Sequence, residues 1–287
     1  MENITPSKVK HHLIVAWLFL AGLLILRLPF VGGILFFTKP TWLEPTYQIG
    51  TYLLTACLIW WERDRLADFN IDTLALAIII LFKPIETIIL SVWGAYELPL
   101  AFPNPPSLLI WIISIGIVLS LRRSHTPLPK LSKNSFGWFG VGILVGLFTV
   151  LLWAYPMSLQ VDKSLINGNP DLKSLFSSDV LIRFFYQLGY AAVSEEPLFR
   201  GFLWGYLHKV GWKTVWIWLF QAGLFALGHI YYINNLPISF WFIVPTGALI
   251  LGALVWRSKT ISSCMAAHAI SNAFGMTIGI IVASFRL

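Results

Sequence analysis

The sequence predicts an all-α protein, a polytopic bundle of about nine transmembrane helices, and three observations support this fold class. Hydrophobic residues make up 57% of the 287 positions and charged residues only 11%, against roughly 25% charged residues in soluble domains. Apolar runs near the length of about 20 residues that crosses a bilayer recur along the whole chain. Many of the 14 Trp residues stand near the ends of these runs, as interfacial aromatic residues do.

The apolar runs define the predicted spans, which cover residues 13–36, 46–61, 73–95, 107–121, 136–156, 179–199, 212–232, 236–256 and 261–284. Basic residues fall in every second connecting segment, beginning with Lys8 and Lys10 before the first span. By the positive-inside rule the N-terminus is then cytoplasmic and the C-terminus outside. We therefore expect an integral protein of a bacterial inner (plasma) membrane. The net charge of +7 comes from these loops and does not indicate a nucleic-acid partner.

Four charged residues inside or near the spans have a structural interpretation. Lys83 and Glu86 are spaced i,i+3, so they can neutralise one another on one helix face. Arg27 and Arg183 lie near span ends, where an arginine can extend its head to the lipid headgroups. The longest polar segment, residues 157–178, is interpreted as an external connector.

The most unusual stretch is Ser194-Glu-Glu-Pro-Leu-Phe-Arg200, at the end of an apolar run. Charged residues at such depth usually face a protein interior and have a function. On a helix Glu196 and Arg200 share a face and form an ion pair, whereas Glu195 is rotated by about 100° and has no cation at that spacing. A carboxylate without a cation in a poorly solvated site is a suitable general base. Pro197 predicts a kink, or a helix restart capped by Ser194.

Two later apolar runs each contribute a histidine. His229 closes Phe225-Ala-Leu-Gly-His229, and His268 precedes Asn272 by four residues, which places both on one helix face. Taken singly, His229 can be a packed or interfacial residue, and the His268–Asn272 pair can be an interhelical hydrogen-bond pair. Their occurrence on successive runs, after the paired acids, favours a joint catalytic site.

A cysteine dyad is the competing interpretation for the last run, because Cys264 and His268 are also spaced i,i+4. Against it, a buried thiol in an apolar run is usually inert. The chain holds only two cysteines and no CxxC pair that would bind a metal.

These three motifs together resemble those of the CAAX-protease and bacteriocin-processing family, also called CPBP or Abi, whose pattern is EExxxR, FxxxH and HxxxN. The resemblance covers about residues 180–285. It implies an intramembrane endopeptidase acting on a peptide or protein substrate at the bilayer. We accordingly expect two parts, a segment 1–178 without a recognised motif and a catalytic membrane domain at 179–287.

The resemblance also implies roles for the site residues. Glu195 and His229 would activate a water molecule, and His268 and Asn272 would stabilise the oxyanion. Glu196 and Arg200 would hold the architecture of the site.

We expect no cofactor, although Glu195, His229 and His268 would be the ligands if zinc were used. The alternatives in other classes are a proton-coupled transporter, against which no inverted repeat is evident, and a non-catalytic binding protein of the bacteriocin-immunity type.

One difficulty concerns depth. His229 lies late in its run and His268 early in a run that starts from the same side. Straight spans would separate the two by more than about 10 Å. The sequence therefore predicts either that the segment 200–212 dips into the bilayer or that one helix is broken.

Overall fold

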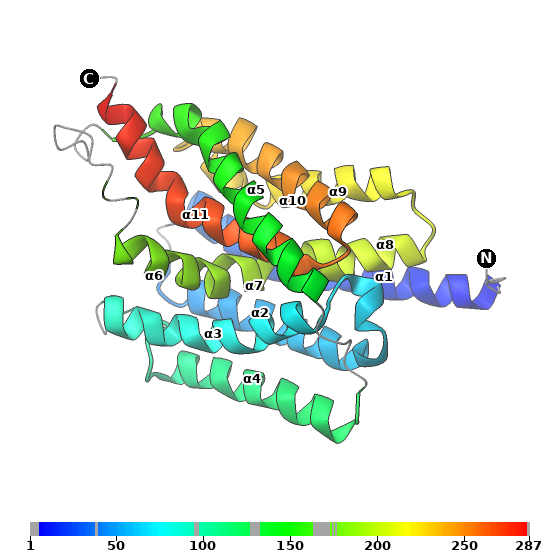
Figure 1. Ribbon diagram of the computed structural model, residues 1–287. Helices are drawn as coiled ribbons and strands as arrows, with labels where there is room; N and C mark the ends of the chain where they lie inside the picture. Colours follow the sequence, from blue (N-terminus) through cyan, green and yellow to red (C-terminus); the bar gives the residue numbers. More distant parts are fainter. Residues whose placement is uncertain are drawn as a thin grey trace.

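The structure, a computed structural model, describes residues 6–37, 40–94, 98–126, 133–162, 173, 175 and 177–285, without the side chains of residues 6–12. All regular elements in this part of the chain are helices, which confirms the all-α class (Figure 1). The N-terminal half contains five long helices joined by short segments, one of which forms the short 3₁₀ helix η1. They are α1 (Pro6–Phe36), α2 (Leu43–Trp61), η1 (Arg63–Phe69), α3 (Thr73–Trp93), α4 (Pro105–Arg123) and α5 (Lys133–Ser158).

The C-terminal half begins with one continuous helical run, 178–209, in which two π-helical stretches interrupt the α-helix. Its parts are α6 (Ser178–Gln187), η4 (Leu188–Ala192), α7 (Val193–Glu196), η5 (Pro197–Leu203) and α8 (Trp204–Lys209). A helical hairpin and a last long helix complete the bundle. They comprise α9 (Thr214–Leu227), the short η6 (Ile230–Tyr232) and η7 (Ser239–Ile243), α10 (Val244–Ser258) and α11 (Ile261–Ser284).

Each predicted span overlaps a helix, and within the described residues six helices are long and apolar enough to cross a membrane. These six are 13–36, 73–93, 105–123, 133–158, 239–258 and 261–284. Large apolar side chains such as Leu18, Ile25 and Leu144 point outward on them, as lipid-facing residues do. The protein is therefore a polytopic helical membrane protein. That 46–61, 179–199 and 212–232 also cross the membrane stays a prediction.

Polar side chains cap the N-terminal ends of three of the long helices. The Asp72 carboxylate accepts a hydrogen bond from the amide of Ala75 at the start of α3. Asn104 and Ser107 cap α4 reciprocally, and the Thr260 hydroxyl accepts from the amide of Ser262 at the start of α11. Each cap satisfies a backbone N–H that has no partner within its helix, which fixes where the helix begins.

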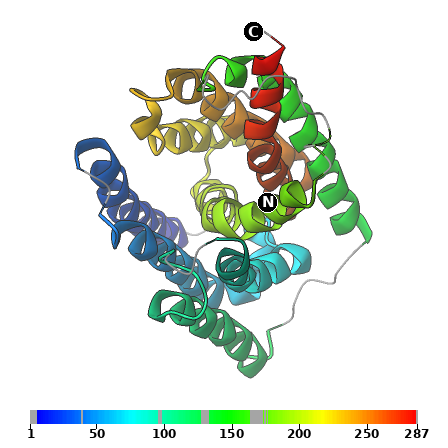
Figure 2. The same cartoon turned by 90° about the vertical axis from the view of Figure 1, so that its left-hand side faces the viewer.

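The helical run 178–209 lies in the middle of the bundle, with the other helices around it (Figure 2). Every residue from Val193 to Leu203 is buried, which is typical of a helix enclosed on all sides. The backbone stays helical through Ser194, so the predicted restart with Ser194 as a cap is wrong. Pro197 has no N–H to bond Val193, and the π-helical turns of η5 begin at Pro197 instead.

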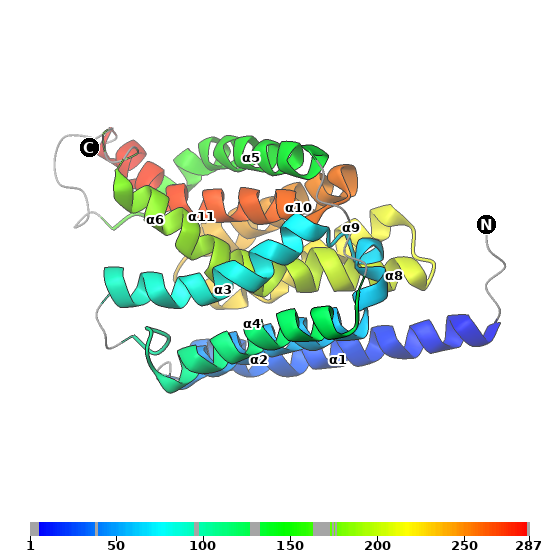
Figure 3. The same ribbon diagram turned by 60° about the horizontal axis from the view of Figure 1, so that its bottom comes forward.

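Glycines allow α5 to lie directly against α11. A Cβ on Gly146 would be 2.7 Å from the carbonyl oxygen of Ala267, and a Cβ on Gly142 would overlap the carbonyl of Ser263. Small residues at such contacts let two helix backbones approach closely. In Figure 3 the layer of α5, α10 and α11 lies on one side of the central run, and α1, α2 and α4 lie on the other.

The predicted pair of Lys83 and Glu86 is confirmed, with Nζ 2.7 Å from Oε2 and both side chains fully buried. The pair is not isolated, however. Lys83 also donates to Oε1 of Gln48 at 2.5 Å and to Oγ of Ser194 at 3.4 Å. This buried polar network therefore reaches the residue next to Glu195.

The expected external connector at residues 157–178 falls largely outside the described residues. Helix α5 continues to Ser158, and the next helix begins at Ser178.

Candidate active site

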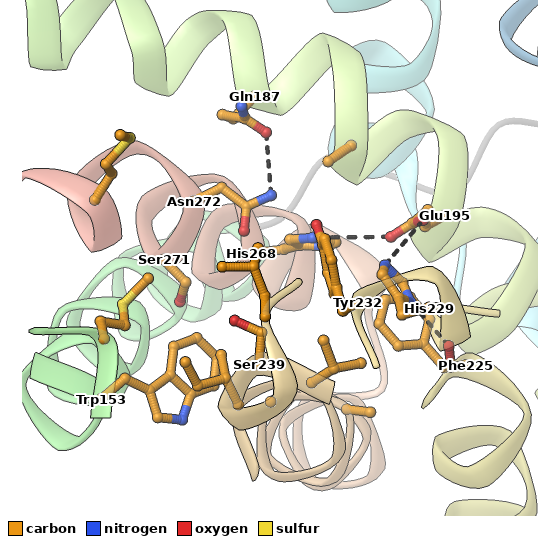
Figure 4. A pocket seen from close by; sticks show the side chains of 18 of the residues that line it. Trp153, Gln187, Glu195, Phe225, His229, Tyr232, Ser239, His268, Ser271 and Asn272 are labelled. Atoms are coloured by element: carbon orange, nitrogen blue, oxygen red, sulfur yellow. Dashed lines mark hydrogen bonds and ion pairs between the residues drawn. The ribbon is translucent and has the colours of Figure 1, made fainter. Parts of the chain in front are cut away.

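Glu195, His229 and His268 meet in the centre of the bundle (Figure 4). Glu195 comes from α7, His229 follows the end of α9, and His268 is on the second turn of α11. The Nε2 atom of His229 is 3.9 Å from Oε1 of Glu195, and Nε2 of His268 is 3.9 Å from Oε2. All three side chains are buried or nearly so. The structure thus brings together three residues that lie 34 and 39 positions apart along the chain.

An offset between two helical hairpins explains how His229 and His268 reach the same depth. The α8–α9 turn extends farther toward the end where the N-terminus lies than the α10–α11 turn does (Figures 1 and 3). Helix α9 therefore starts farther out, and it ends at Leu227, so His229 reaches the level of His268. The alternative of a broken helix fits this arrangement, because the predicted span 212–232 is interrupted after Leu227 and only the short η6 follows. That the segment 200–212 dips into the bilayer stays a prediction.

Glu196 joins two motifs through one oxygen. Its Oε1 accepts from Nη1 of Arg200 at 3.2 Å and from Nδ1 of His268 at 2.7 Å. This confirms the predicted i,i+4 pair, and neither Glu196 nor Arg200 is exposed. The Arg200 guanidinium also lies 4.3 Å from the ring centroid of Phe225, the first residue of the second motif. All three motifs therefore contact one another around Arg200.

The hydrogen bonds orient both imidazole rings. Nδ1 of His229 donates to the carbonyl oxygen of Phe225 at 2.9 Å, and Nδ1 of His268 faces the Glu196 carboxylate. Because a carbonyl or a carboxylate only accepts, each Nδ1 carries a proton, and a neutral ring then presents a lone pair at Nε2. Both Nε2 atoms are turned toward Glu195, so each ring can accept a proton there.

The expectation that Glu195 is free of any cation is wrong. Nη1 of Arg27 donates to Oε1 of Glu195 at 2.9 Å and also bonds the Tyr47 hydroxyl. The prediction that Arg27 reaches the headgroups is wrong for the same reason, since this residue is only 6% exposed. Its position in an apolar run was the available signal, because buried membrane charges usually have partners. Arg183 is not part of this site; it stacks on Trp93 with 5.6 Å between Cζ and the ring centroid.

Asn272 lies on the same face of α11 as His268 but at the wall of the cavity. Its Nδ2 donates to Oε1 of Gln187, at 3.0 Å (Figure 4). The sequence did not indicate Gln187, because a lone glutamine in an apolar run has no distinctive spacing. An amide has two N–H donors, so the second can still point to a bound group.

A cavity of about 610 Å³ connects these residues. It is lined by the side chains of the site, by aromatic residues such as Tyr232 and Trp153, and by apolar residues such as Met276. Much of the lining comes from the ends of helices that point away from the N-terminus: Phe30, Met157, Gln160, Tyr231, Leu236 and Gly279. An apolar cavity with a few convergent polar groups is the usual form of a binding site.

The site is a poor fit for zinc. Within the described part of the chain no three His, Cys, Asp or Glu side chains are arranged to hold a metal ion. Moreover, the Arg27 guanidinium donates to Oε1 of Glu195 at 2.9 Å, and it would repel a metal cation bound to this carboxylate.

Residues 177–274 match a family model described as type II CAAX prenyl endopeptidase, Rce1-like. We call residues 177–274 the CAAX-protease segment after this similarity. It includes all three motifs and ends shortly after Asn272, so the recognition made from the sequence is confirmed. The CAAX-protease segment does not include Arg27 or Tyr47. No curated protein and no solved structure matches the chain.

Proposed function

We propose that this protein is an intramembrane endopeptidase that uses a glutamate-activated water molecule. One observation carries the proposal: the two oxygens of Glu195 face Nε2 of His229 and Nε2 of His268 inside a cavity among membrane-spanning helices. The separations of 3.9 Å are too long for direct hydrogen bonds, but a water molecule can bridge polar groups at such distances. The CAAX-protease segment supports the same reaction class.

In the proposed reaction, Glu195 and His229 take a proton from water while the water oxygen attacks the peptide carbonyl carbon. The tetrahedral oxyanion accepts hydrogen bonds from His268 and Asn272. The C–N bond then breaks, and the leaving amine receives the proton that the site took from water. The water oxygen remains in the new carboxyl group.

His268 must be protonated at both ring nitrogens to donate from Nε2, because Nδ1 already donates to Glu196. The Glu196 carboxylate accepts the hydrogen bond from Nδ1 in either protonation state of the ring. This gives Glu196 and Arg200 their proposed role of holding His268 in place rather than contacting substrate.

We propose a peptide or protein substrate that is held at the membrane, with no cofactor and no nucleic-acid partner. The aromatic and apolar lining of the cavity favours an apolar peptide segment over a charged one.

Reporter fusions should place the N-terminus in the cytoplasm and the C-terminus outside. The cavity is lined largely from the helix ends opposite the N-terminus, so we expect substrate to enter from the extracytoplasmic side. Fusions at Lys130, Asn167 and Leu287 decide the topology. A cytoplasmic signal at Asn167 would contradict both the orientation and the direction of entry.

The function is tested by comparing membrane proteins and secreted peptides from cells that carry the intact protein or its Glu195→Ala variant. We expect a set of peptide ends that require Glu195. If the two cell lines yield the same ends, the protein is not a protease, and the transporter or the binding-protein alternative takes its place.

Cys264→Ala should retain most of the activity, and thiol alkylation should inhibit weakly. Cys264 is buried, and its thiol donates to the carbonyl oxygen of Ile261 at 3.1 Å. Both ring nitrogens of His268 are directed toward glutamates rather than toward this thiol. By comparison, His268→Ala should lower the rate on the order of a hundredfold or more, the scale of a lost oxyanion donor. If a folded Cys264→Ala variant is as inactive as His268→Ala, the thiol is the nucleophile.

A further inference from the structure

Arg27 is a charged residue of the site that comes from outside the CAAX-protease segment. It lies near the end of α1, in a span that is apolar apart from this residue. Its guanidinium donates to Oε1 of Glu195 at 2.9 Å and to the hydroxyl of Tyr47 on α2. The Nη2 atom is 3.4 Å from Nδ1 of His229. One cation thus contacts the proposed base and one of its histidines, and it connects both to the first two helices.

While both histidines are neutral, the charges of the site balance only when Arg27 is included. Glu195 and Glu196 are adjacent and buried, and Arg200 neutralises one of them. With neutral histidines the CAAX-protease segment alone would hold one uncompensated negative charge in a poorly solvated site. Such a carboxylate takes up a proton, and a protonated acid cannot accept one from water. The Arg27 guanidinium supplies the missing positive charge.

The backbone before His229 is shaped to admit this guanidinium. A Cβ at Gly228 would lie 2.7 Å from Nε of Arg27 and 3.1 Å from Nη2. The guanidinium cannot easily move away, because its Nη1 atom is hydrogen-bonded to both Glu195 and Tyr47. Glycine at this position therefore serves the contact between α1 and the catalytic residues.

We propose that Arg27 is a positioning residue of the active site, which keeps Glu195 charged and holds its carboxylate between the two histidines. This inference rests on the proposed proteolytic function. Under this proposal α1 and α2 belong to the catalytic domain, so the N-terminal segment is not a part separate from it. A guanidinium suits this position, since one of its nitrogens donates to both Glu195 and Tyr47.

The test compares Arg27→Gln and Arg27→Lys with Arg183→Gln, an arginine outside the site. The probe is a synthetic peptide spanning a cleavage site found in the comparison of cells above. We expect Arg27→Gln to lower kcat on the order of a hundredfold, the scale of a misplaced catalytic group, with KM little changed. The acid limb of its pH profile should move to higher pH, because Glu195 without its cation stays protonated longer. Arg27→Lys should restore the pH profile but only part of kcat.

Wild-type kinetics for Arg27→Gln at every pH would overturn the role of Arg27 while leaving the proposed function intact. A fall in kcat with an unchanged pH profile would also overturn it, since that result indicates a structural role only. Equal cleavage by the intact protein and Glu195→Gln would instead remove the proposed function itself.

A second pair of variants covers the case in which Arg27→Gln does not fold. Gly228→Ala should displace the guanidinium and move the acid limb in the same direction. Gly223→Ala on the same helix is the control, because a Cβ there meets nothing within 4 Å. Equal pH profiles for Gly228→Ala and the intact protein would contradict the proposal.

Discussion

Glu195→Gln should abolish proteolysis while the protein still folds. The amide has the shape of the carboxylate, and its oxygen can still accept the Arg27 hydrogen bond that Glu195 receives at 2.9 Å. It cannot accept a proton from water, so we expect cleavage to fall by about a hundredfold to ten-thousandfold, the range of a lost general base. The measurement is cleavage of the synthetic peptide together with thermal unfolding in detergent.

Glu62→Gln is the matched control for this variant. Glu62 is also buried and accepts from the Tyr206 hydroxyl at 3.1 Å, but it lies at the start of η1, away from the cavity. We expect it to leave cleavage unchanged. Normal cleavage by a folded Glu195→Gln variant would remove the general-base role from Glu195.

Arg200→Ala should cause the largest loss of stability among single substitutions at the site, on the order of 3–5 kcal/mol. It leaves Glu196 fully buried without the cation that pairs with it. It also removes the guanidinium that packs on Phe225. Yield and unfolding temperature should both fall, and Arg183→Ala, which removes an arginine stacked on Trp93 outside the site, should change them little.

The double variant Glu196→Gln, Arg200→Ala distinguishes the destabilisation caused by the unpaired charge from that caused by the lost packing of Arg200. Removing both charges leaves no isolated anion, so the double variant should be less unstable than Arg200→Ala alone. If the two substitutions change the unfolding temperature additively, Glu196 and Arg200 do not interact and the interpretation of this pair fails.

Features within one helix were predictable from the sequence. The i,i+4 spacing of Glu196 and Arg200 and the i,i+3 spacing of Lys83 and Glu86 predicted two ion pairs. The structure confirms both pairs and shows them buried. Helical geometry is the same wherever the helix lies, so i,i+3 and i,i+4 relations need no tertiary information. The apolar runs likewise located the helices because lipid requires a satisfied backbone.

Features between helices were not predictable in the same way. The contacts of Arg27 with Glu195 and of Gln187 with Asn272 depend on the vertical register of neighbouring helices. Periodicity along one helix does not contain that register. The π-helical turns beside Glu195 were also missed, since the lone Pro197 fits a kink or a restart equally well.

The central claim is that water, activated at Glu195, attacks the peptide bond directly. It is tested most directly by the mass of the N-terminal cleavage product formed in ¹⁸O-enriched water that also contains hydroxylamine, which traps acyl-enzymes as hydroxamates. We predict a product carboxyl group that carries solvent oxygen, no hydroxamate, and a rate of product formation by Glu195→Gln that is lower by about a hundredfold or more. A hydroxamate product would show that an acyl-enzyme forms on the protein, and it would contradict the account.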